Sequence, residues 1–61
     1  MDFEKLKSEI YLIYREYESN YAYGFCAGMI YASYVNDKIS DGQRSSLDLI
    51  NRQTFNGVLV T

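Results

Sequence analysis

The stretch YAYGFCAGMIYASYV, residues 21 to 35, decides the fold of this 61-residue chain. It contains no charged residue and no proline, and small residues recur in it at steps of four: Gly24, Gly28 and Ala32. Recurrence at three or four residues is typical of one face of a helix. The stretch therefore predicts a helix. The stripe of small residues along it could face a membrane, a pocket or another helix.

The pattern of apolar residues predicts an all-α fold in one small domain over residues 1–61. An antiparallel hairpin of two helices is followed by a shorter third helix and a tail, at about 2–19, 21–36, 40–53 and 54–61. The turn signal Asn56-Gly57 precedes a β-prone run, so we expect the tail to dock or to fray.

Two matching seams are expected to form the hairpin core. They are Phe3, Leu6, Ile10, Ile13 and Tyr17 in the first helix and Tyr21, Phe25, Gly28, Ala32 and Val35 in the second. Alternating steps of three and four place each set on one helix face. The seams have the same length, as an antiparallel pair requires.

Capping residues set the expected helix ends. Asp2 can cap the first helix, and Ser19 and Asn20 favour its end because both prefer caps and turns to helix interiors. Ser40, with Gln43 three residues later, has the capping-box pattern at the start of the third helix.

The chain is short enough that its core is marginal, since a domain of about 60 residues buries only about 60% of its unfolded surface. One cysteine and no histidine are present, so neither an internal disulfide nor a typical zinc site can add stability. Oligomerisation is the remaining route, and a homodimer is expected.

No catalytic, metal-binding or cofactor-binding residue is predicted. Without histidine the common Ser–His and Cys–His nucleophiles cannot form. Cys26 lies among apolar neighbours and is expected to be a packed, inert thiol. The carboxylates are expected to be solvated charges on helix surfaces. The chain is therefore not expected to be an enzyme.

Charge and hydropathy bear on two other classes of function. The net charge is −2 and the basic residues are scattered, which disfavours direct binding to nucleic acid, although a small transcription-regulatory protein stays an alternative. Residues 19–36 are uncharged and approach the length of about 20 residues that a membrane span needs. Their tyrosines, serines and asparagines argue against insertion, and a membrane-inserted peptide is kept as a second alternative.

The charged N-terminal segment lacks the apolar run of a signal peptide. Together with the single cysteine, this predicts a cytoplasmic protein.

Glycines and tyrosines supply the candidate site residues. Each glycine inside a helix costs about 1 kcal/mol relative to alanine, so a closely packed neighbour is expected to offset Gly24 and Gly28. Gly24, Gly28, Ala32 and Phe25 are predicted to form a helix-packing or dimer interface, with the neighbour being either the first helix or a second copy. Tyrosine is enriched at protein interfaces, so Tyr11, Tyr14, Tyr31 and Tyr34 are candidate partner contacts, the alternative being the rim of the core.

In its small size, acidity, tyrosine content and lack of a chemical site, the chain resembles small phage or mobile-element proteins that inhibit host machinery by binding it, including inhibitors of antiviral defence. The resemblance rests on general character and on no specific motif. It implies a non-enzymatic, homodimeric protein–protein interaction module that occludes a surface of an unidentified protein target.

Overall fold

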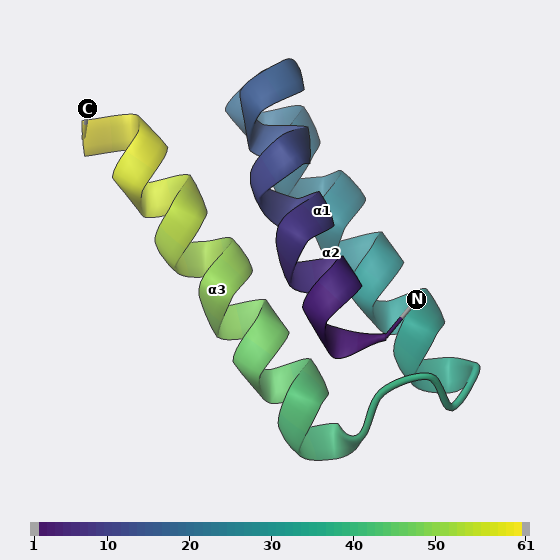
Figure 1. Ribbon diagram of the computed structural model, residues 1–61. Coiled ribbons are helices and arrows are strands. Elements are labelled where there is room, and N and C mark those ends of the chain that lie inside the picture. Colours follow the sequence, from purple (N-terminus) through teal and green to yellow (C-terminus); the bar gives the residue numbers. More distant parts are fainter. Residues whose placement is uncertain (1, 61) are drawn as a thin grey trace.

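Three helices run up, down and up again in the computed structural model, which describes residues 2–60 and their side chains as far as Gly57 (Figure 1). They are α1 (Phe3–Glu16), α2 (Ser19–Val35) and α3 (Asp41–Val60). Each helix contacts the other two, and α3 packs more extensively on α2 than on α1. The predicted all-α hairpin with a third helix is confirmed.

The connection between α1 and α2 is only two residues long. Asp2 begins α1 as predicted, because its carboxylate accepts a hydrogen bond of 2.9 Å from the Lys5 amide. Ser19 and Asn20 do not end this helix, and that prediction is wrong. Glu18 instead caps α2, accepting from the amides of Asn20 at 2.6 Å and Tyr21 at 3.3 Å. The carboxylate satisfies two amides that would otherwise lack partners in the first helical turn.

The turn after α2 reverses the chain through a left-handed residue, Asp37, at φ 59°. The Lys38 amide donates to the Ser33 carbonyl at 2.9 Å, and the Asp37 amide donates to the Tyr34 carbonyl at 3.1 Å. These two bonds are those of a Schellman motif, which satisfies the last carbonyls of a helix. Ile39 follows and is buried, so it anchors the connection as the sequence predicts.

The predicted capping box at the start of α3 is confirmed. The Gln43 amide donates to the Ser40 hydroxyl at 3.2 Å, and the Ser40 amide donates to the Gln43 side chain at 3.0 Å. This reciprocal pair satisfies two backbone amides at once.

The third helix is longer than predicted. Residues 54–60, expected to form a tail, continue α3 to Val60. Extending an existing helix adds one backbone hydrogen bond for each residue that is fixed, and the Phe55 ring packs against Tyr23 at 4.9 Å between centroids. Together these outweigh the turn signal of Asn56-Gly57. The prediction that the tail docks or frays concerns in part the side chains of residues 58–60 and Thr61, which lie outside the described part of the chain.

The core lies between the three helices, and among the side chains described as far as Gly57 it contains eight buried hydrophobic residues: Leu6, Ile10 and Ile13 of α1, Ala22, Cys26 and Ile30 of α2, and Ile39 and Leu47. The α1 part agrees with the predicted seam. Phe3 is only partly buried against this cluster, and Tyr17 is exposed.

The predicted seam of α2 is wrong. Tyr21, Phe25, Gly28, Ala32 and Val35 are all exposed. The buried residues form a different face, which we call the inner face of α2: Ala22, Cys26, Ile30 and Ser33. Most of its side chains are small, so α1 and α3 can both pack closely on it.

A buried asparagine on α3 joins all three helices. Asn51 is 2% exposed, and its side-chain oxygen accepts a hydrogen bond of 2.7 Å from the Tyr14 hydroxyl of α1. Its side-chain nitrogen donates to the Tyr23 carbonyl of α2 at 3.2 Å. Within the part of the chain that is described, every buried side-chain nitrogen and oxygen has a hydrogen-bond partner.

Replacement of Asn51 by leucine is expected to lower the free energy of unfolding by about 1–3 kcal/mol, because the Tyr23 carbonyl loses its side-chain donor and the Tyr14 hydroxyl keeps only its longer bond of 3.2 Å to the carbonyl of residue 51. Urea unfolding followed by circular dichroism measures the change. The double variant Asn51→Leu, Tyr14→Phe removes both ends of the bond and should lose less than the sum of the single variants. Tyr11→Phe, which removes an exposed hydroxyl, is the control and should change stability by less than about 0.5 kcal/mol. An Asn51→Leu chain as stable as the unmodified protein would contradict this role.

Candidate functional site

The side of α2 that points away from the core is an exposed apolar surface. With 3.6 residues per turn, it lies opposite the inner face. We call it the outer face of α2, and its residues are Tyr21, Gly24, Phe25, Gly28, Tyr31, Ala32 and Val35. The exposed fractions of its large side chains are 54% for Tyr21, 48% for Phe25, 58% for Tyr31 and 53% for Val35. No charged side chain lies anywhere on α2.

Aromatic rings line the N-terminal half of this surface. The ring of Tyr17, in the turn before α2, lies 5.2 Å from that of Tyr21, which lies 5.9 Å from that of Phe25. Separations of 4.5–7 Å are those of favourable aromatic contacts. The three rings therefore form a continuous apolar ridge that the protein exposes to its surroundings.

The glycines of the outer face have open space beside them. A Cβ atom added at Gly24 or at Gly28 would meet no atom within 4 Å. The prediction that they let the first helix of the same chain come close is therefore wrong. The alternative prediction, that the neighbour is a second copy of the chain, is not tested by this observation and stays a prediction.

The four tyrosines predicted as partner contacts divide into two pairs. Tyr11, 46% exposed on α1, and Tyr31 on the outer face of α2 are open to contact. Tyr14 and Tyr34 are partly buried against the core, as in the alternative reading.

Tyr14 and Tyr34 both have partners within the chain. Burial of the Tyr14 hydroxyl raises its pKa to about 12, so it stays protonated and donates to Asn51. The Arg44 guanidinium lies 4.8 Å from the centre of the Tyr34 ring, and hydrogen bonding to the Asp41 carboxylate raises the pKa of the Tyr34 hydroxyl. These two side chains hold the helices together.

Cys26 lies in the core, as predicted for a packed thiol. Burial raises its pKa to about 11, and the negative charge of Glu9 adds to this effect. A thiol of this kind is almost wholly protonated near neutral pH, and the protonated form is a poor nucleophile.

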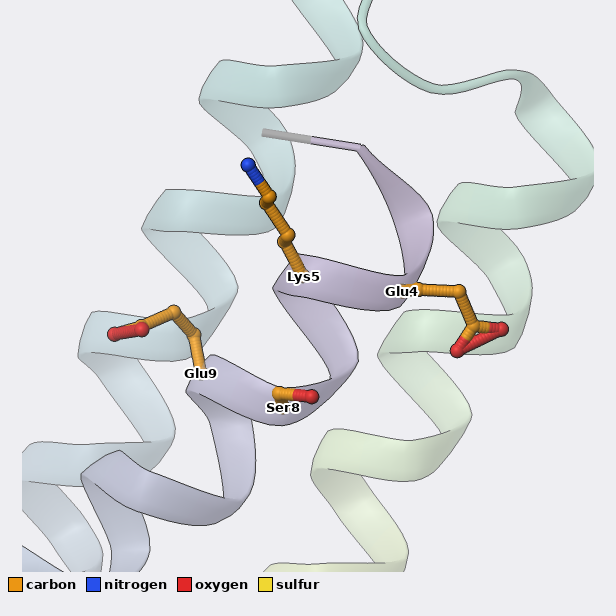
Figure 2. A pocket seen from close by; sticks show the side chains of 4 residues that line it. All are labelled: Glu4, Lys5, Ser8 and Glu9. Atoms are coloured by element: carbon orange, nitrogen blue, oxygen red, sulfur yellow. The ribbon is translucent and has the colours of Figure 1, made fainter.

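A shallow depression lies on α1. Its lining residues, Glu4, Lys5, Ser8 and Glu9, all come from adjacent turns of one helix (Figure 2). Glu4 points to one side of the helix, whereas Lys5 and Glu9 point to the other. Because the side chains diverge, they do not gather around a substrate.

Two other kinds of site were sought over residues 2–60. No group of three or more acidic or cysteine side chains in this range is placed to hold a metal ion. None of the helices described, α2 included, is long and apolar enough to cross a membrane. The outer face of α2 thus stands as the candidate site; the sequence pattern predicts part of it as a helix-packing or dimer interface and, wrongly, part of it as the hairpin core.

Comparison with protein-family models, with curated proteins and with solved structures gives no match. The function proposed below rests on the surfaces of this chain.

The buried position of Cys26 predicts slow reaction with a disulfide reagent such as DTNB. At pH 8 a thiol of pKa about 11 is ionised to about one part in a thousand. The reagent also reaches this buried thiol only when the helices open transiently. We expect the folded protein to react at least about 100-fold more slowly than the same protein in urea. Equal rates in the two conditions would show that Cys26 is accessible.

Proposed function

We propose that the protein is a non-enzymatic protein–protein interaction module and that the outer face of α2 is its binding surface. The observation that carries the proposal is the exposure of an uncharged, aromatic helix face. Contiguous exposed apolar patches of this kind mark interaction sites in soluble proteins. Tyrosine and phenylalanine are enriched in such sites, and charged residues are depleted from their centres.

The distribution of apolar side chains supports the choice of surface. The described core of α2 holds Ala22, Cys26 and Ile30, while the larger Tyr21, Phe25 and Tyr31 stay exposed. Burying an aromatic ring is worth about 1.5–3 kcal/mol. A partner that covers the outer face would therefore gain more from α2 than the protein's own core does.

In this proposal the protein acts by covering a surface of its target, as a small inhibitor does. Binding alone is sufficient for this role, and it needs no nucleophile, metal ion or cofactor. Tyr11 and its exposed neighbour Leu12 lie on α1 and offer a second apolar contact, apart from α2.

Phe25→Asp tests the binding surface, and Leu49→Asp is its matched control. The two side chains have nearly equal exposed fractions, 48% and 47%, but Leu49 lies on α3. Phe25→Asp should weaken binding to captured partner proteins by about 30-fold or more, as loss of a central aromatic contact does. Leu49→Asp should leave binding unchanged, and both variants should keep the helix content of the unmodified protein.

The measurement is affinity capture from the cells that produce the protein, followed by titration of each captured partner. Retention of every partner by Phe25→Asp would contradict the assignment of the surface. Absence of any partner, including a second copy, would contradict the proposed function.

A further inference from the structure

We propose that the partner on the outer face of α2 is a second copy of this chain, packed antiparallel across a twofold axis that passes beside Gly28. This inference rests on the proposed function and names the occupant of the same surface. Four features of the outer face support it: its register, its open space, its flanking charges and its area.

The register of the outer face is self-complementary. In an antiparallel pair centred on Gly28, residues at equal distances from Gly28 lie opposite each other. Gly24 then faces the partner's Ala32, Phe25 faces the partner's Tyr31, and Tyr21 faces the partner's Val35. A small residue meets a small residue at one pair, an aromatic ring meets an aromatic ring at the next, and Tyr21 meets an aliphatic side chain. A twofold interface requires this kind of match, because the same patch serves both sides.

The open space beside the stripe suits a second helix. No atom of the chain lies within 4 Å of a Cβ built at Gly24 or Gly28. Without these side chains a neighbouring backbone can come closer than the usual 8–10 Å between helix axes. Close packing offsets the helix stability of about 1 kcal/mol that each glycine loses relative to alanine.

Charges beyond the two ends of α2 favour the antiparallel direction. Exposed Glu18 precedes the helix and exposed Lys38 follows it. Both are equally far from Gly28 in the sequence, so an antiparallel pair brings the end of α2 that Glu18 caps to the partner's Lys38, beside which exposed Asp37 also lies. A parallel pair would bring the two Glu18 carboxylates together. Antiparallel helices also place opposite ends of their dipoles side by side.

The area of the face fits a small dimer. Three aromatic rings, each about half exposed, together with Val35 and the small residues, supply about 400 Å² or more per copy on the basis of 150–250 Å² per aromatic side chain. Adjoining Tyr17 enlarges this surface. Two such faces bury about 800 Å² or more in total, which places the pair among the weak and transient complexes that bury less than about 1,200 Å².

The composition of the face favours a second copy over an unrelated protein. Transient interfaces are about as polar as the rest of a protein surface, whereas homodimer interfaces are more apolar. From Ser19 to Asn36 the chain has no charge. No like-charged pair is therefore buried when two copies of an acidic chain meet there.

Gly28→Leu separates this inference from a folding effect. A Cβ atom added there has no neighbour within 4 Å, and leucine is a better helix former than glycine, so the variant should fold. It should also keep two copies apart. Ala27→Leu, at an exposed position of α2 outside the outer face, is the matched control.

Sedimentation equilibrium of the full chain gives the result. The unmodified protein and Ala27→Leu should have the mass of two chains, and Gly28→Leu the mass of one, with unchanged helix content. A single-chain mass for the unmodified protein at 100 μM, or a two-chain mass for Gly28→Leu, would overturn the proposal.

Cysteine crosslinking tests the direction and the register. In the antiparallel pair, position 24 of one copy lies beside position 32 of the other but about 12 Å from position 24, at 1.5 Å per residue. Disulfides need Cα atoms within about 7 Å. A mixture of Gly24→Cys and Ala32→Cys chains should therefore crosslink under mild oxidation. Each alone should stay at the level of the unmodified protein, which contains buried Cys26. Crosslinking of Gly24→Cys with itself would indicate a parallel pair and overturn the proposed arrangement.

The two proposals fail in different ways. If the unmodified protein is monomeric but still captures another protein through Phe25, the second-copy inference is wrong and the proposed function stands. If it is monomeric and captures nothing, both are wrong.

Discussion

The hydrogen bonds of Asn51 set the arrangement of the three helices. This side chain accepts from Tyr14 of α1 and donates to the Tyr23 carbonyl of α2, and it is almost fully buried while doing so. A buried amide without partners is unfavourable by about 1–3 kcal/mol, so alternative packings that separate these groups are penalised. Apolar contacts alone would tolerate a rotation of α2 about its axis, because both of its faces are apolar. The bond to Tyr23 fixes that rotation.

Fixing α2 in this way decides which residues remain for binding. Ala22, Cys26 and Ser33 are turned inward, where their small size lets α1 and α3 pack closely. Tyr21, Phe25 and Tyr31 are turned outward. The helix thus packs its smaller side chains against α1 and α3 and leaves its aromatic side chains exposed. The rotation of α2 about its axis thus determines both the small side chains of the core and the large exposed apolar face.

The sequence predicted the helix starts at Asp2 and Ser40 and the charged surface of α1 correctly, whereas it placed the end of α1 wrongly at Ser19 and Asn20. The seam of Leu6, Ile10 and Ile13 is recognisable because charged residues fill the rest of α1. The capping box of Ser40 and Gln43 is a local arrangement that needs no tertiary contact. Fold class and helix number follow from such signals.

The same reasoning failed where tertiary contacts decide. Two faces of α2 satisfy helical spacing, and with no charge on either, the pattern cannot choose between them. Asn51 was passed over because a polar residue is normally exposed, and its role depends on Tyr14, which is distant in the sequence. The extension of α3 depends on the contact between Phe55 and Tyr23. The sequence pattern places Gly24, Phe25, Gly28 and Ala32 on one face, and the structure exposes that face; their role in a dimer interface stays a prediction.

Isotope-filtered NMR on a mixture of labelled and unlabelled chains tests most directly the proposal that a second copy covers the outer face of α2. The method detects only proton contacts between two different copies. The proposed pair predicts contacts between the Phe25 ring of one copy and the Tyr31 ring of the other, and between the two Gly28 residues. Absence of contacts between copies, or contacts confined to residues such as Leu12 and Leu49 on the other helices, would contradict the account.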